Sequence, residues 1–273
     1  MEITNRFTES SDELSKRKAC RTLSDVLESE EFRIGCGDLS IFLGINDPGK
    51  PIMEDLSECN HLLVTGENGV GKTSFVSTLL LGLVSKYTPE EIGILLIGER
   101  EEFGKYNDLK HLVQPLISSP EDTLEALSGL AKLLKERHET FASLKARNFR
   151  EYSLVRQTLI SVGKGDNIKN LKRIVVIIDG LESVMTDETE IILRRMTTLY
   201  RHTGIHLILT AHSTRDMSAL MKADLSHRVK LIHSGERVLL ERGKNAGEPV
   251  YTVKATAEEI AKILNNNKIG ELR

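Results

Sequence analysis

The feature that most constrains the fold is the octapeptide Gly-Glu-Asn-Gly-Val-Gly-Lys-Thr at residues 66–73. It matches G-x-x-x-x-G-K-[ST], a pattern whose glycines let the backbone turn back and direct its N–H groups at phosphate oxygens. The apolar run 61–65 precedes it, and Phe75, Leu79 and Leu83 follow at helical spacing. A helix that begins at such a loop adds the positive end of its dipole. The segment therefore predicts a triphosphate-binding loop between a buried strand and a helix.

Every residue of this loop is a candidate for holding nucleotide: Gly66, Glu67, Asn68, Gly69, Val70, Gly71, Lys72 and Thr73. The Lys72 ammonium is expected to reach the β- and γ-phosphates, and the Thr73 hydroxyl is expected to ligate Mg²⁺. ATP and Mg²⁺ are therefore the expected cofactors. A plain glycine turn with a solvated lysine is the alternative interpretation.

A second apolar run, residues 174–178, ends in the carboxylate of Asp179. Strands of this kind bring one aspartate to the Mg²⁺ shell in P-loop proteins, so Asp179 joins Thr73 as a candidate metal and catalytic residue. An aspartate that only caps the next turn is the alternative. Many ATPases place a glutamate next, to polarise the attacking water. Here that position is Gly180, and Glu182 is the candidate replacement. The sequence predicts binding and leaves hydrolysis open.

Three further residues are candidates for completing the site. His212 follows the apolar run 205–211, where a γ-phosphate sensor would be useful, although a surface histidine fits as well. Arg195 and Arg201 belong to the predicted helix before that run. Either one could act on the ATP of a neighbouring subunit, or be a solvated charge of the helix face.

The pattern of apolar segments predicts an α/β fold with a mainly parallel, helix-covered sheet, because strands and helices alternate and the strands are apolar on both faces. The expected strands are 61–65, 92–97, 174–179 and 205–211, and the expected helices are 72–86, 121–145 and 188–202. A hairpin is expected within 33–58, and short antiparallel or edge strands at 228–232, 237–241 and 250–253 precede a helix from 257. Residues 1–31 are expected to form an N-terminal helical or linker segment, and 32–273 the nucleotide-binding domain.

Composition excludes several classes of protein. Aromatic residues make up only 4% of the 273 residues and tryptophan is absent, which argues against a base-stacking platform. The net charge of −3 gives no support for a passive DNA binder, although a ring can gather its cations on an inner face. Cys20, Cys36 and Cys59 have neither disulfide nor zinc spacing. No signal sequence or run of roughly 18–20 apolar residues is found. A cytoplasmic location is expected, with membrane attachment only through another chain or segment.

Beyond the loop, the chain resembles the FtsK/SpoIIIE family, within the FtsK–HerA group of ring ATPases. The resemblance runs from about residue 43 to residue 228 and depends on an ordered set of segments: Leu43-Gly44, Gly49-Lys50-Pro51, Asp55-Leu56, Glu136-Arg137, Arg147-Asn148, Tyr152, residues 204–207, residues 220–224 and Arg228. It implies a RecA-like P-loop fold and a hexameric ring with ATP between subunits. By resemblance, Lys72 and Thr73 carry phosphate and Mg²⁺ binding, Asp179 is the Walker B acid, and His212 stands at the position of a sensor glutamine. Arg195 and Arg201 align with arginines near the subunit interface.

The resemblance leaves three functions open. The first is an ATP-driven double-stranded DNA translocase, with Lys145, Arg147 and Arg150 as candidates for salt-sensitive contacts to the DNA backbone; an exposed basic helix end is the alternative interpretation of these three residues. The second is an ATP-binding domain of a type VII protein-secretion motor with weak or absent hydrolysis, which Gly180 and the short segment after Arg228 favour; an apolar groove would take the substrate helix. The third is a nucleotide-dependent switch or assembly partner. A homo-oligomer or neighbouring ATPase domains are the expected protein partners.

Overall fold

The computed structural model describes residues 20–164, 168–214, 217–234, 237–242 and 249–268. Its strands are β1 (Ser40–Asn46), β2 (Pro51–Asp55), β3 (His61–Gly66), β4 (Ile92–Ile97), β5 (Arg173–Ile178), β6 (Ile205–Ala211), β7 (Arg228–Ser234), β8 (Arg237–Arg242) and β9 (Val250–Tyr251). Within the described residues, these strands form one sheet in the order β2-β1-β9-β8-β7-β3-β6-β5-β4. The predicted α/β class is confirmed.

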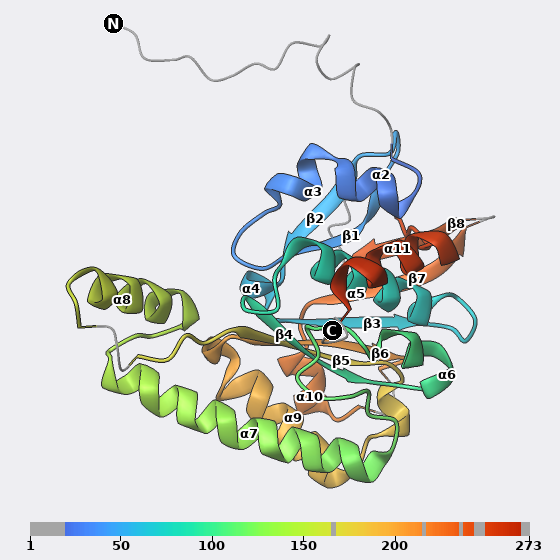
Figure 1. The fold of residues 1–273 in the computed structure, drawn as a ribbon. Helices are drawn as coiled ribbons and strands as arrows, with labels where there is room; N and C mark the ends of the chain where they lie inside the picture. Colours follow the sequence, from blue (N-terminus) through green and yellow to red (C-terminus); the bar gives the residue numbers. More distant parts are fainter. Residues whose placement is uncertain (1–19, 165–167, 215–216, 235–236, 243–248, 269–273) are drawn as a thin grey trace, which may run out of the picture.

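Helices cover both faces of this sheet (Figure 1). They are α2 (Leu23–Glu28), α3 (Glu30–Ile34), α4 (Leu56–Cys59), α5 (Lys72–Lys86), α6 (Arg100–Phe103), α7 (Pro120–Ser143), α8 (Phe149–Ser161), α9 (Asp187–Thr198), α10 (Ala219–Asp224) and α11 (Ala257–Asn267), with short 3-10 turns η1 (Gly104–Tyr106), η2 (Leu181–Ser183) and η3 (Arg201–Thr203). Helices α2, α3, α5 and α11 lie on one face, and α7, α9 and α10 lie on the other. No helix in the described part of the chain has the length and apolar character that crossing a bilayer requires.

The parallel half of the sheet positions the predicted site. Strands β7, β3, β6, β5 and β4 run parallel, with Thr65 opposite Ala211 and Ile178 opposite Leu209. The carboxyl ends of parallel strands meet at one edge, where α/β proteins bind ligands. We call this the carboxyl edge and the opposite one the amino edge. The segments that follow β3, β5 and β6 therefore meet at the carboxyl edge.

The antiparallel half joins the two ends of the described chain. The predicted hairpin is present as β1 and β2, and the predicted short strands are β7, β8 and β9. Strands β8 and β9 pair antiparallel as expected, whereas β7 also pairs parallel with β3, and none of the three lies at an edge of the described sheet. Strand β9 pairs with both β8 and β1, so the hairpin and the C-terminal strands belong to the same sheet as the parallel strands. Apolar side chains of β5 alternate between the faces: Val175 and Ile177 pack in the core under α5, and Val176 and Ile178 in the core under α7 and α9.

Two of the longer helices differ from the sequence-based expectations, and the short helices α4, α6 and α10 were not predicted. Helix α9 ends at Thr198 rather than at 202, and the η3 turn follows it. Helix α8 is absent from the predicted elements. Its exposed surface includes Leu154 (55% exposed) and Ile160 (47% exposed), so its apolar residues do not form the single stripe that marks an amphipathic helix.

The predicted boundary at residue 31 does not coincide with a break in packing. Leu23 and Val26 of α2 are fully buried in the core that α5 shares. The Glu259 carboxylate accepts the backbone N–H of Ser24 at 2.6 Å and that of Thr256 at 2.8 Å. One side chain therefore ties the N-terminus of α2 to that of α11. Residues 1–19 of the predicted linker segment lie outside the described residues.

Of the three histidines buried in the described part of the chain, His61, His111 and His206, two have strongly lowered pKa values that make stability depend on pH. His61 and His206 are 3% and 2% exposed. The Nδ1 atom of His61 accepts the backbone N–H of Leu207 at 3.2 Å, and Nδ1 of His206 lies 3.1 Å from the carbonyl oxygen of Asn60. Burial lowers the pKa of His61 to about 4 and that of His206 to about 3, because desolvation disfavours the imidazolium ion.

The free energy of unfolding is expected to fall as the pH drops from 6.5 toward 4. In that range the unfolded chain binds a proton at His61 and one at His206 that the folded chain does not, and each contributes up to about 1.4 kcal/mol per pH unit. Above pH 6.5 the stabilisation by the neutral rings is fully present. Urea unfolding at a series of pH values measures this slope. His206→Leu should flatten it, whereas a change at exposed His233 should not; equal slopes for wild type and His206→Leu would contradict the assignment.

Candidate nucleotide-binding site

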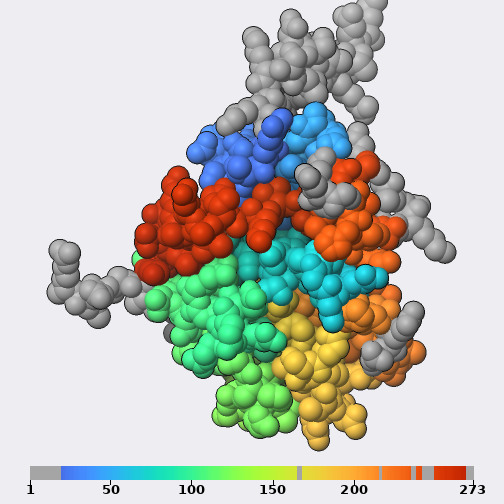
Figure 2. Space-filling view, turned by 90° about the vertical axis from the view of Figure 1, so that its right-hand side faces the viewer, coloured from blue at the N-terminus to red at the C-terminus, as the bar shows by residue number. Residues whose placement is uncertain are grey.

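The predicted phosphate loop connects β3 to α5 at the carboxyl edge. Gly69 and Gly71 have φ of +80° and +101°, and a Cβ atom at either position would meet no other atom within 4 Å. Glycine is therefore needed there for backbone conformation and not for packing. Figure 2 looks onto this edge, with the cyan segment around the loop in the middle of the face. Glu67 and Asn68 are exposed, whereas Val70 is 2% exposed and packs into the core.

The Lys72 ammonium is held over the loop by the loop itself. Its Nζ donates to the carbonyl oxygen of Gly66 at 2.8 Å and to that of Glu67 at 3.1 Å. Lys72 and Thr73 form the first turn of α5, where the backbone N–H groups have no partner within the helix. A cation and free amides thus share one short stretch of surface, which is the combination that binds polyphosphates.

Asp179, the predicted acid after β5, contacts the phosphate loop. The Thr73 hydroxyl donates to Oδ2 of Asp179 at 2.7 Å, although the two residues come from different strand–helix units. A hydroxyl that donates its proton keeps its oxygen lone pairs. Thr73 Oγ1 can therefore ligate a hard cation while its hydroxyl proton stays hydrogen-bonded to the Asp179 carboxylate. Oxygen ligands of this kind suit Mg²⁺.

A residue that sequence reasoning missed completes this contact. Thr210, near the end of β6, donates to Oδ1 of Asp179 at 2.8 Å and accepts the backbone N–H of Gly180 at 2.7 Å. The one signal in the sequence is a hydroxyl in the otherwise apolar end of a strand, Leu-Ile-Leu-Thr-Ala. That signal is weak, since threonine is common in strands.

The structure brings Glu182 and His212 together. The backbone N–H of His212 donates to Oε1 of Glu182, so the η2 turn is attached to the end of β6. Gly180 has φ of +79° and ψ of +65°, a left-handed conformation that costs other residues roughly 1–2 kcal/mol. A glutamate at position 180 would therefore be strained in this turn.

Arg195 and Arg201 do not belong to the carboxyl edge. Arg195 is exposed in the last turn of α9, and Arg201 is exposed in η3, which leads into the start of β6. The positive charge of Arg201 also contributes to the lowered pKa of His61 at the beginning of β3. Both arginines thus lie toward the amino edge, across the sheet from the Lys72 of their own chain.

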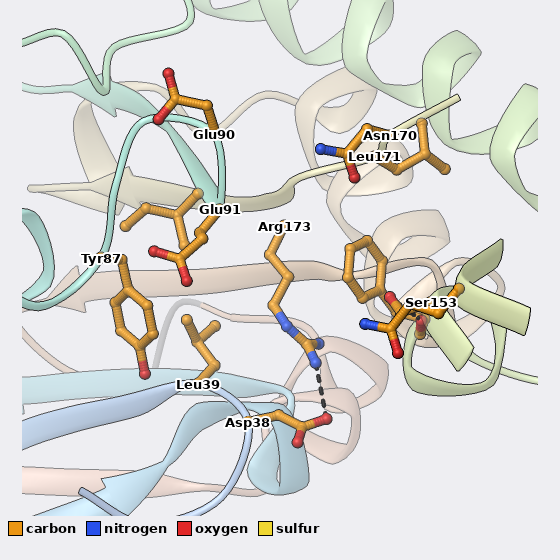
Figure 3. A pocket seen from close by; sticks show the side chains of 12 residues that line it. Asp38, Leu39, Tyr87, Glu90, Glu91, Ser153, Asn170, Leu171 and Arg173 are labelled. Carbon is orange, nitrogen blue, oxygen red and sulfur yellow. Dashed lines mark hydrogen bonds and ion pairs between the residues drawn. The ribbon is translucent and has the colours of Figure 1, made fainter. Parts of the chain in front are cut away.

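A separate cavity of about 360 Å³ opens at the amino edge. Figure 3 shows Arg173 in its centre, where the guanidinium group points to Asp38. The ion pair measures 2.9 Å, and the same guanidinium group lies 4.6 Å from the ring centroid of Phe149. These contacts join α8 and the segment just before β1 to β5. None of the predicted site residues lines this cavity.

A strand–loop–helix unit with this loop, beside a strand whose terminal aspartate meets the loop threonine, defines a P-loop nucleotide-binding domain. The chain belongs to the FtsK/SpoIIIE family, whose family model matches residues 22–216.

Curated relatives agree with this membership. The chain is similar to the DNA translocase FtsK of Clostridium tetani, with 30% identity over 230 residues that cover 81% of this chain and 30% of the relative. It is also similar to the DNA translocase FtsK of Haemophilus influenzae, with 30% identity over 246 residues that cover 81% of this chain and 46% of the relative. The chain thus spans less than half the length of these relatives.

Solved structures share the fold at lower identity. EccC (ATPases 2 and 3) of Thermomonospora curvata, solved in complex with a signal sequence peptide, gives a TM-score of 0.71 at 16% identity over 88% of this chain and 48% of that one. The pCW3 conjugation coupling protein TcpA, solved in its monomer form with ATPγS, gives a TM-score of 0.64 at 19% identity. The match covers 88% of this chain and 73% of that one. At these identities the likeness concerns the fold alone.

Proposed function

We propose that this chain is an FtsK-type motor domain that binds ATP with Mg²⁺ at residues 66–73 and uses hydrolysis to move double-stranded DNA. The observation that carries the nucleotide site is the 2.7 Å contact between Thr73 and Asp179 beside the Lys72 ammonium. The DNA substrate is supported by family membership and by the curated relatives, which are DNA translocases. We propose that the domain acts in the cytoplasm, with any membrane attachment through another segment or chain.

The residues at the carboxyl edge fit a magnesium–triphosphate complex. The left-handed glycines of the loop leave room for phosphate oxygens, and Lys72 would exchange its bonds to loop carbonyls for bonds to the β- and γ-phosphates. Bound Mg²⁺ would neutralise charge on these phosphates. Thr73 would ligate the cation, and Asp179 would orient the Thr73 hydroxyl and the water of the cation shell.

Hydrolysis needs a group that orients the attacking water. We propose Glu182 for this role, because its carboxylate lies at the carboxyl edge against the end of β6. His212, at the same place, is the proposed sensor of the γ-phosphate. Since Glu182 is already engaged by a backbone N–H, slow basal turnover is the expected behaviour.

We propose that several copies assemble into a ring in which Arg195 and Arg201 act across the subunit boundary. Their position toward the amino edge supports this, since neither arginine belongs to the edge that carries the loop of its own chain. A head-to-tail ring joins two different surfaces of neighbouring subunits, so it can bring the amino edge of one subunit against the carboxyl edge of the next. Six subunits are the number that the family resemblance implies.

Contacts to DNA are proposed for the basic residues at the junction of α7 and α8. Lys145, Arg147 and Arg150 are all exposed. Arg147 is engaged by Glu151, with Nη2 2.6 Å from Oε1, which makes Lys145 and Arg150 the better candidates. Contacts of this type are independent of sequence and weaken with salt.

Double-stranded DNA is expected to raise ATP turnover several-fold at low salt, and the stimulation is expected to fall steeply as salt rises. Steady-state ATPase assays with and without DNA, beside a sizing measurement, test this. The Lys145→Ala/Arg150→Ala variant should lose much of the stimulation, whereas Lys135→Ala, which removes an exposed lysine of α7, should keep it. Stimulation that survives in the double variant would exclude this DNA surface.

The alternative is an ATP-binding domain of a protein-secretion motor with weak or absent hydrolysis. Gly180 favours it, because no acid directly follows Asp179. Tight ATP binding without turnover, unchanged by DNA, would support this alternative over the DNA motor.

A further inference from the structure

The buried hydroxyl of Thr210 has two hydrogen-bond partners, and both belong to the turn that contains Asp179. The side chain is 1% exposed, so its hydroxyl must find its partners inside the protein. It does so with a carboxylate oxygen of Asp179 and the N–H of Gly180, two groups of the adjacent turn. One hydroxyl thus both donates and accepts, which fixes the direction of its proton.

This arrangement separates the two oxygens of Asp179. Oδ1 receives the Thr210 hydroxyl at 2.8 Å and Oδ2 receives the Thr73 hydroxyl at 2.7 Å. Rotation of a carboxylate about its last bond is otherwise broad. With one donor on each oxygen, the plane of the carboxylate is set, and Oδ2 is directed at the phosphate loop.

The same hydroxyl also holds the backbone beyond Asp179. Gly180 turns the chain in a left-handed conformation, and its N–H ends on Thr210 Oγ1. Two residues later, Glu182 meets the N–H of His212. Thr210 and His212 therefore attach the turn to β6 at two successive points, one before and one after the bend.

We propose that Thr210 is the positioning residue of the magnesium site: its hydroxyl directs the Asp179 carboxylate toward Thr73 and fixes the turn that carries Glu182. The inference rests on the proposed function, since it concerns how the same site takes its cation. Thr210 itself touches neither nucleotide nor metal in this scheme. Its effect should therefore show in the magnesium dependence of binding more than in binding itself.

The test measures the affinity of a fluorescent, non-hydrolysable ATP analogue in Mg²⁺ and in EDTA. For Thr210→Val, which keeps the branched shape and removes the hydroxyl, the gain in affinity that Mg²⁺ provides is expected to shrink at least about tenfold, since a hydrogen bond to a charged group is lost. Affinity in EDTA should change less than about threefold. Thr210→Ser restores the hydroxyl and should restore the magnesium effect.

Two controls separate the possible results. Thr203→Val also removes a buried hydroxyl, at the amino edge, and should leave the magnesium effect intact. Unchanged affinity for the ATP analogue in EDTA shows that Thr210→Val is folded. If Thr210→Val does not fold, Thr210→Ala replaces it in the same measurement. A wild-type magnesium effect in Thr210→Val would overturn this inference alone. Absence of any magnesium-dependent binding by the wild-type chain would overturn the proposed function and this inference together.

Discussion

Replacing Lys72 with alanine is expected to weaken ATP binding at least about 100-fold and to abolish turnover. The ammonium group is proposed to make charge-assisted bonds to two phosphates, and each such bond contributes about 1.5–3 kcal/mol. The loop should stay folded, because its turns depend on its glycines and on the buried Val70. Calorimetric titration with ATP in millimolar Mg²⁺ measures the affinity. Lys135→Ala, which removes an exposed lysine of α7, is the matched control.

The same variant tests whether the arginines act between subunits. Chains with Lys72→Ala keep Arg195 and Arg201, and chains with Arg195→Ala/Arg201→Ala keep the phosphate loop. If the arginines complete a neighbour's site, mixing the two inactive chains should recover part of the turnover. Mixtures as inactive as their components would place the arginines outside the reaction, and wild-type ATP affinity in Lys72→Ala would remove the phosphate loop from the site.

Replacing Gly204 with alanine is expected to destabilise the fold by about 3 kcal/mol or more. Gly204 has φ of +81°, and a Cβ atom there would lie 2.2 Å from Cδ2 of Phe149. The left-handed backbone costs alanine roughly 1–2 kcal/mol, and overpacking adds about 1–3 kcal/mol. The ring cannot move freely, because it is buried and Arg173 lies 4.6 Å from its centroid. Shifting it would disturb the attachment of α8 to β5.

Gly129 provides the matched control for this substitution. It lies inside α7, and a Cβ atom at this position would meet nothing within 4 Å. Gly129→Ala is expected to stabilise the protein by about 0.5–1 kcal/mol. Urea unfolding of both variants measures the difference. If Gly204→Ala proved as stable as Gly129→Ala, the close approach of Gly204 to Phe149 would be wrong.

Local patterns predicted most of the elements but not their pairing. The run before Gly66 and the helix from Lys72 are visible in the sequence because apolar spacing and glycine placement act over a few residues. The position of β9 between β1 and β8 could not be predicted, since Val250 and its partner Asn46 are far apart in the chain. The packing of α2 against α11 depends on Glu259, another distant contact.

In the candidate site, too, local patterns predicted some residues, and contacts between distant segments determine the others. Lys72, Thr73 and Asp179 follow from motif and strand ends, and the structure places Thr73 against Asp179. Thr210 was missed because its role depends on β6 lying directly beside β5, which no local pattern reveals. The left-handed conformation of Gly180 could not be predicted either, because it belongs to a tight turn that the pattern of apolar residues does not reveal.

The strand order also governs how a nascent chain can fold as it leaves the ribosome. When β6 has emerged, β3 has a neighbour on one side only, and β1 has no partner except β2. Both strands then present unpaired edges, which are sites of mispairing during synthesis. The open edge of β3, the strand that leads into the phosphate loop, closes when β7 appears. The open edge of β1 closes when β9 appears. Pairing of β3 on both sides is thus tied to translation of residues 228–234, far beyond the phosphate loop itself.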